Sequence, residues 1–355
     1  MLEQKNPTEM DDTQVLAEIK AARERLLGEI SKVVVGQHQV VDLMLTALFA
    51  QGHCLFVGVP GLAKTLLVST TAQALGLEFN RIQFTPDLMP ADITGTEILE
   101  EDRVTGQRQM RFLEGPVFTN LLLADEINRT PPKTQAALLQ AMQEREVSVG
   151  GRTLPLPAPF QVFATQNPIE QEGTYPLPEA QLDRFMLSIH VDYPSADEEL
   201  EIVRRTTMGT QAQVEAVVSR ALLLRMQQVV RQVEVSKEVM EAAVKLARST
   251  RPGPQAPEAT RKWVSWGAGP RASQYLVLGA KAWAALQRGA GPEGGAARIS
   301  DLRQVASAVL RHRVLLNFQA EAAEVVLVAK LMEATDRAHT TGMVEQIGTT
   351  DTATI

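Results

Sequence analysis

A short glycine-containing loop constrains the fold of this chain more than any other sequence feature. The loop reads Gly58-Val59-Pro60-Gly61-Leu62-Ala63-Lys64-Thr65. It follows an apolar run, Cys54–Gly58, and opens a helical pattern that includes Leu66. Glycines let backbone N–H groups wrap phosphate oxygens, and the following helix directs its positive end at the same charge. The pattern predicts a strand–loop–helix phosphate site, with Lys64 on the β- and γ-phosphates and the Thr65 hydroxyl on Mg²⁺.

One residue of the loop departs from the strict motif. Ala63 stands where glycine is usual, and its methyl group restricts the backbone. The alternative interpretation is a glycine turn with a solvent-exposed lysine. The strand before the loop and the helix after it favour phosphate binding.

A pair of acids at the end of a second apolar run supports the same interpretation. Leu121–Ala124 is followed by Asp125 and Glu126. Ligands of parallel sheets bind beyond the carboxyl ends of strands, so both acids are expected to face the loop. Asp125 can hold Mg²⁺, and Glu126 can deprotonate the attacking water. A solvated acidic turn is the alternative.

A third apolar run ends in an amide. Phe163–Thr165 leads to Gln166 and Asn167, and Asn167 could hold the same water or the γ-phosphate. An Asx turn before Pro168 is the alternative for Asn167.

The order of apolar runs and helical patterns predicts the architecture. Strands are expected at Cys54–Gly58, Phe79–Phe84, Asn120–Ala124, Val162–Thr165 and Leu187–Val191. Their alternation with helices favours an open, mostly parallel sheet, and their lack of polar alternation suits strands covered on both faces. Two hairpins, at 96–112 and 147–156, interrupt this rhythm. Either hairpin could be a plain surface turn.

The strand signal stops near Ser195. Helical patterns follow at 196–206, 217–233, 237–249, 271–288, 300–314 and 320–334, broken by Gly/Pro-rich loops at 251–270 and 289–298. We therefore expect a leader at 1–12, an α/β domain at 13–195 and a helical domain at 196–338. A disordered tail is expected at 339–355, which is rich in Thr and Gly.

Composition limits the classes of partner and compartment. The net charge is −7, which argues against a protein held on duplex nucleic acid mainly by phosphate contacts. The first fourteen residues lack a basic start followed by an apolar stretch, so no signal peptide is expected. No apolar run reaches the roughly 18 residues of a membrane span. A cytoplasmic protein without membrane insertion is predicted.

The motifs, taken in order, resemble those of the MoxR family of AAA+ ATPases. The matching segments are Val35-Gly36-Gln37, the loop at 58–65, Phe84–Asp92, Gly115-Pro116, Asp125–Arg129, Ala164–Pro168 and Leu177–Phe185. The resemblance is dense over 31–206. It implies a P-loop NTPase α/β fold, with a five-stranded parallel sheet flanked by helices and an all-helical lid after it. Nucleotide would sit between the two domains.

The resemblance also assigns roles by position. It implies that Val35, Gly36 and Gln37 lie along the adenine, and that Asn167 is the sensor-1 residue. Arg184 matches the arginine finger, which reaches the nucleotide of a neighbouring subunit. Arg271 matches the sensor-2 arginine at the start of a lid helix. The full set expected to bind nucleotide is Val35, Gly36, Gln37, Gly58, Pro60, Gly61, Leu62, Ala63, Lys64, Thr65 and Leu66.

The function implied by the resemblance is hydrolysis of ATP to ADP and phosphate, with Mg²⁺, in a homo-oligomeric, hexameric ring. Hydrolysis would drive chaperone-like remodelling of a protein client, one carrying a von Willebrand factor A-like domain. A nucleic-acid translocase and a nucleotide-gated scaffold without turnover are the alternatives. Arg129 could form a further contact between subunits or a structural salt bridge.

Overall fold

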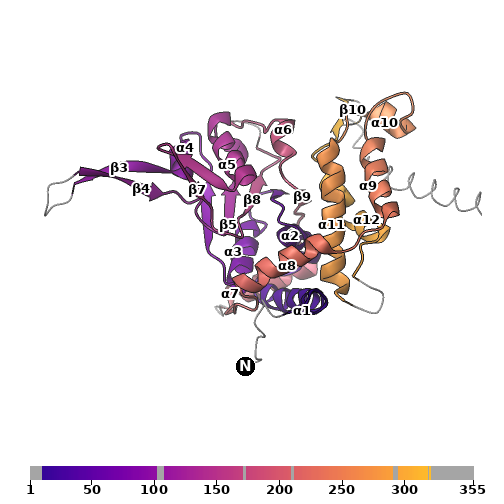
Figure 1. Ribbon diagram of the computed structural model, residues 1–355, viewed down its shortest axis with the longest axis horizontal. Helices are drawn as coiled ribbons and strands as arrows, with labels where there is room; N and C mark the ends of the chain where they lie inside the picture. The colour runs from indigo at the N-terminus through magenta and orange to yellow at the C-terminus, as the bar shows by residue number, and fades with distance from the viewer. Residues whose placement is uncertain are drawn as a thin grey trace, which may run out of the picture.

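The structure is a computed structural model that describes residues 10–101, 108–170, 173–208, 212–290, 295–318 and 320 (Figure 1). Five predictions fall wholly or partly outside these residues. They concern the leader before residue 10, the turn of the first hairpin at 102–106, the loop at 289–298, the helical pattern after residue 320, and the tail at 339–355.

A five-stranded parallel sheet forms the centre of the first part of the chain. Its strand order is β2-β5-β8-β1-β9. The bounds are β1 Cys54–Val57, β2 Phe79–Gln83, β5 Leu121–Asp125, β8 Gln161–Gln166 and β9 Leu187–His190. All five predicted strands are confirmed. The order also places β1 between β8 and β9, a crossover arrangement that sequence reasoning did not specify.

Alternate residues of the strands belong to two separate hydrophobic cores. Leu121 and Leu123 pack into a core with the helices α1 (Asp12–Ser31), α2 (His38–Phe49) and α3 (Lys64–Ala74). Leu122 and Ala124 face the other way, into a core with α5 (Pro132–Glu144). Side chains of a strand point alternately to the two faces of the sheet. Because helices cover both faces, β5 is apolar at each position from Leu121 to Ala124 and lacks polar alternation.

The elements after β9 are almost all helical. They are α7 Ala196–Thr207, α8 Arg220–Gln232, α9 Lys237–Ser249, α10 Glu258–Trp263, β10 Val264–Trp266, α11 Pro270–Arg288, α12 Ile299–Leu310 and β11 Leu315–Leu316. Helices α9, α11 and α12 lie side by side (Figure 1). No helix in the described part of the chain is long and apolar enough to cross a bilayer.

Two short elements lie where the sequence predicts only a loop. Residues 251–270 contain α10 and β10, and β10 pairs antiparallel with β11. Val264 pairs with Leu316 across about fifty residues of chain. A local pattern cannot reveal a three-residue strand whose partner is this distant.

Both predicted hairpins are present. The first pairs β3 (Gly95–Glu101) with β4 (Arg108–Glu114), after the short helix α4 (Pro90–Thr94). The second pairs β6 (Glu146–Val149) with β7 (Arg152–Pro155). The β3–β4 hairpin projects away from the rest of the molecule (Figure 1) and exposes Leu99 and Met110.

A nearly buried ion pair joins α11 to α12. Two nitrogens of Arg288 approach the two carboxylate oxygens of Asp301 at 2.6 Å each. Asp301 also accepts the backbone N–H of Arg298 at 2.7 Å, which caps α12. The Asp301 side chain is only 4% exposed, so its charge depends on these donors.

We expect Asp301→Ala to lower the free energy of unfolding by about 3 kcal/mol or more, because it leaves the Arg288 charge without its carboxylate. Urea denaturation measures this. Glu201→Ala is the control, because Glu201 pairs with Arg204 and Arg205 on an exposed face of α7. An Asp301→Ala loss no larger than that of Glu201→Ala would contradict the account.

Candidate active site

The glycine loop joins β1 to α3 at the carboxyl end of the sheet. Gly61 has φ +86° and Ala63 has φ 54°, so both are left-handed. An added Cβ at Gly58 would lie 2.6 Å from the backbone oxygen of Val191, which explains the glycine there. Ala63 adopts the conformation that glycine takes easily, at a cost of roughly 1–2 kcal/mol. The departure from the motif therefore leaves the local backbone shape intact.

The Lys64 side chain folds back over this loop. Its Nζ donates to the backbone oxygens of Gly58 at 2.9 Å and of Val59 at 2.6 Å. Burial lowers the pKa of Lys64, while the charges of Asp125 and Glu126 oppose that shift. The charge of Lys64 is therefore stabilised by the loop carbonyls and by the two acids.

Asp125 ends β5 and is held by residues of the two neighbouring strands. Arg81 of β2 pairs with its Oδ2 at 2.6 Å, and Thr165 of β8 donates to its Oδ1 at 2.5 Å. The same Thr165 hydroxyl accepts the backbone N–H of Glu126 at 2.8 Å. Thr165 thus fixes both acids relative to β8. Sequence reasoning missed Arg81 and gave Thr165 no role, because both depend on the strand order.

Glu126 also has a constrained position. Its φ is 56°, and it precedes the 3₁₀ turn Ile127–Arg129. Gln83 of β2 donates to Glu126 Oε2 at 2.8 Å, and Arg129 Nε lies 3.3 Å from that oxygen. Arg129 also pairs with Glu170. Of the two interpretations of Arg129, the structure has the intrachain salt bridge.

Asn167 follows β8 and lies beside the acids. Its Oδ1 accepts the backbone N–H of Ile169 at 3.1 Å, so the Asx turn is present. The oxygen is engaged locally, which leaves the amide NH₂ group as the part able to meet a ligand. Asn167 is nearly buried and nevertheless lines the pocket above the loop.

These residues enclose a pocket of about 210 Å³. It is lined by Gly58, Pro60, Gly61, Lys64, Thr65, Arg81, Gln83, Asp125, Glu126, Thr165, Gln166 and Asn167. The predicted lysine, threonine, acids and amide are therefore brought together. All the lining residues lie within 58–167, so this phosphate end of the site contains no residue of the second domain.

The segment expected along the adenine is tied to the same loop. Gln37 has φ 54° and begins α2, and its Nε2 donates to the backbone oxygen of Leu62 at 3.2 Å. The Glu198 side chain of α7 lies so close to Gly36 that an added Cβ would collide with it. The second domain approaches the site at this end. Six residues of the predicted nucleotide-binding set do not line the 210 Å³ pocket, namely Val35, Gly36, Gln37, Leu62, Ala63 and Leu66.

Arg184 and Arg271 lie at the opposite end of the sheet. Arg184 precedes β9, and Arg271 lies in the first turn of α11, as expected, with its Nη1 3.1 Å from Asp183 Oδ2. Both line a second pocket of about 300 Å³, together with His53. His53 precedes β1 and Gly58 follows it, so four residues of strand, roughly 13 Å, separate the two pockets. Neither arginine is placed at the phosphate loop of its own chain.

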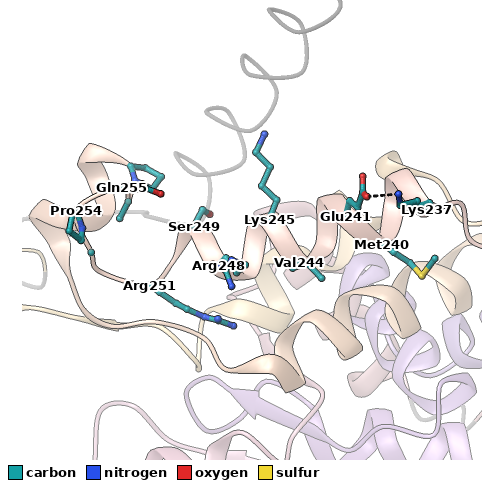
Figure 2. A pocket seen from close by; sticks show the side chains of 13 residues that line it. Lys237, Met240, Glu241, Val244, Lys245, Arg248, Ser249, Arg251, Pro254 and Gln255 are labelled. Atoms are coloured by element: carbon teal, nitrogen blue, oxygen red, sulfur yellow. Dashed lines mark ion pairs between the residues drawn. The ribbon is translucent and has the colours of Figure 1, made fainter.

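Cavity size alone does not locate the chemistry. A larger groove, about 910 Å³, runs along α9 and the loop at 251–257 (Figure 2). It carries one ion pair, Lys237 with Glu241 at 3.4 Å, and exposes Met240 and Val244. None of its lining residues belongs to a predicted motif. We assign the groove no catalytic role.

Comparison with known proteins agrees with the fold and the motifs. The model of the "ATPase family associated with various cellular activities (AAA)" matches residues 53–187, and an AAA lid domain model matches 256–333. A solved structure from Cytophaga hutchinsonii, assigned as an ATPase, superposes with a TM-score of 0.81 at 40% identity, covering 90% of this chain and 96% of that one. The fold and site thus define an AAA+ ATPase with a lid.

Two curated relatives narrow the class. "Chaperone MoxR1" of Mycobacterium tuberculosis is 47% identical over 85% of this chain and 78% of its own. "Protein MoxR" of Paracoccus denitrificans is 32% identical over 86% of this chain and 92% of its own. The chain belongs to the MoxR family of AAA+ ATPases.

His53 is buried in the wall of the second pocket in a defined neutral form. The backbone N–H of Val162 donates to its Nδ1 at 2.9 Å, and its Nε2 lies 3.0 Å from the Met142 backbone oxygen. Nε2 therefore carries the proton. Burial, chiefly, lowers the pKa of His53 to about 4.

This shift predicts a pH dependence of stability. Between pH 6.5 and about 4 the unfolded chain binds a proton at His53 and the folded chain does not. The contribution of neutral His53 to the free energy of unfolding is therefore fully present above pH 6.5. As the pH falls towards 4, the free energy of unfolding decreases by up to roughly 3 kcal/mol. His53→Gln should remove this part of the slope in urea titrations, and His38→Gln, at an exposed position, should not. Equal slopes in the wild type and His53→Gln would contradict the assignment.

Proposed function

We propose that the chain hydrolyses ATP to ADP and phosphate in an oligomeric ring and uses the energy to remodel a protein client. The observation that carries the proposal is the pocket at the carboxyl end of the sheet, where Lys64 and Thr65 face Asp125, Glu126 and Asn167. Cation, hydroxyl, carboxylates and amide are the groups that phosphoryl transfer to water requires.

Each group of the pocket has a proposed role. Lys64 binds the β- and γ-phosphates, exchanging backbone oxygens for phosphate oxygens. Thr65 and Asp125 hold Mg²⁺, an ion that prefers such oxygen ligands and would neutralise phosphate charge. Glu126 takes a proton from the attacking water, and the Asn167 amide orients that water or the γ-phosphate. Asp125 would hold the ion in place of its present partner, Arg81.

The same proposal divides the chain near residue 195. The sheet ends at His190 and α7 begins at Ala196, which supports a boundary there. Arg184 and Arg271, far from the phosphate loop of their own chain, would act on the nucleotide of a neighbouring subunit. Hydrolysis would then depend on assembly, here into a hexamer in the cytoplasm.

The protein client is proposed from the family. The name of the Mycobacterium tuberculosis relative contains the word chaperone. We propose a protein partner that carries a von Willebrand factor A-like domain, with the two hairpins, β3–β4 and β6–β7, as candidate contacts.

Two variants separate binding from turnover. We expect Lys64→Ala to lose nucleotide binding, because it removes the cation over the loop. We expect Glu126→Gln to bind ATP but to turn over roughly 10²–10⁴-fold more slowly, because it removes the general base. Equilibrium nucleotide titrations and Mg²⁺-dependent ATPase assays measure these effects. Full turnover by Glu126→Gln would refute its role, and a wild type without turnover would favour the scaffold alternative.

A variant of Arg184 tests whether the active site is shared between two subunits. Arg184→Ala should keep ATP affinity and lose turnover by roughly 10³-fold, because the charge of the transition state is left uncompensated. Addition of Glu126→Gln subunits, which supply an intact Arg184, should restore part of the rate. If no ratio of the two subunits restores turnover, Arg184 acts within its own chain or only structurally.

A further inference from the structure

The second pocket, at the amino ends of β1 and β9, gathers four arginines. Its lining includes Arg145, Arg184, Arg231 and Arg271, here called the arginine pocket, with Ala50, Gln51, His53, Met142, Gln143, Tyr275 and Leu278. Among these described lining residues there is no aspartate or glutamate. The single histidine is held neutral. The arginine pocket is therefore strongly cationic.

Two of these arginines converge on a neutral oxygen. Arg145 places Nη1 and Nη2 at 3.5 Å from Gln51 Oε1, and Arg231 places Nη2 at 3.4 Å from the same atom. Neither forms an ion pair within the described part of the chain. Gln51 is oriented in turn by Gln227, which accepts from Gln51 Nε2 at 3.3 Å. The fold thus holds two like charges together around a fixed amide.

Arg271 adds to the excess of positive charge. Arg271 shares Asp183 with the buried Arg313, which approaches that carboxylate at 2.7 Å. One carboxylate therefore serves two guanidinium groups. Partial burial lowers the pKa of Arg145, and the neighbouring positive charge of Arg231 lowers it further. An anion with several charges would offset this repulsion.

The chemistry of the lining points to a polyphosphate group. Guanidinium groups donate planar pairs of hydrogen bonds that match phosphate oxygens. A volume of about 300 Å³ suits a phosphate chain better than a whole nucleotide. The phosphate loop of the same chain cannot supply this group, because β1 lies between the two pockets. The phosphates must belong to another molecule.

We propose that Arg145 and Arg231 are further phosphate-binding residues, which act together with Arg184 and Arg271 on the nucleotide held by a second copy of this chain. This inference rests on the proposed function. Two pockets at opposite ends of one sheet suit head-to-tail contact, in which the arginine pocket of one copy meets the phosphate loop of the next. Contacts of this kind close into rings.

The test uses the full chain with Arg145→Gln and Arg231→Gln. Each variant should keep ATP affinity and lose at least about tenfold in turnover, the value of one charge-assisted hydrogen bond. Arg145→Lys, which retains the charge, should lose less. Arg204→Gln is the matched control, because Arg204 pairs with Glu201 on exposed α7. Circular dichroism melting curves confirm that the variants are folded.

A second arm identifies the source of the phosphates. Lys64→Ala subunits retain the arginine pocket, so mixing them with Arg145→Gln subunits should restore turnover. Inorganic tripolyphosphate is titrated calorimetrically into dilute, monomeric Lys64→Ala. Restoration by mixing supports the second copy. Tripolyphosphate binding without restoration overturns it in favour of a free anion.

The failures of the two proposals are distinguishable. A wild type without Mg²⁺-dependent turnover overturns the proposed function. A wild type that turns over, with Arg145→Gln and Arg231→Gln indistinguishable from Arg204→Gln, overturns only the role of the arginine pocket.

Discussion

The parallel direction of the five strands is the constraint on which the rest of the structure depends. Because all strands run the same way, the sheet has two chemically different ends. At the carboxyl end, Lys64, Asp125 and Asn167 lie where three different strands end, and they meet in one pocket. At the amino end, segments that are far apart in the sequence place four arginine side chains, those of Arg145, Arg184, Arg231 and Arg271, around one pocket. Helices cover both faces of the sheet, and β1, β5 and β8 place alternate side chains in the two cores, which holds the strands in this arrangement.

The charges at the carboxyl end are balanced within the described chain. Arg81 offsets Asp125, Arg129 offsets Glu126, and both acids favour the charged form of the partly buried Lys64. A nucleotide and its metal ion would therefore replace some of these ion pairs when they bind, since the pocket is already lined by paired charges. The Thr165 hydroxyl, bonded to the carboxylate of Asp125 and the backbone of Glu126, keeps the acids in place during such an exchange.

The sequence predicted features that are contiguous along the chain. Three features are recognisable from short stretches of sequence, namely the loop at 58–65, the acids at the end of β5 and the amide after β8. A parallel sheet brings the ends of these strands together. Arg81 and Gln83 could not be predicted, because their roles require β2 to lie beside β5. Arg145 and Arg231 gave no signal, because an arginine at a helix end is ordinary until its neighbours are known. The small β10–β11 pair was missed for the same reason, namely that its two strands are distant in the sequence.

The central claim is that one active site is built from two copies of the chain, because the arginines lie at the wrong end of the sheet to serve their own phosphate loop. The most direct measurement is the Mg²⁺-dependent ATPase rate per subunit over a wide range of protein concentration, with sedimentation velocity on the same samples. The account predicts that turnover per subunit rises steeply as chains assemble and nearly vanishes where single chains dominate. Undiminished turnover in samples that sediment as single chains would contradict it.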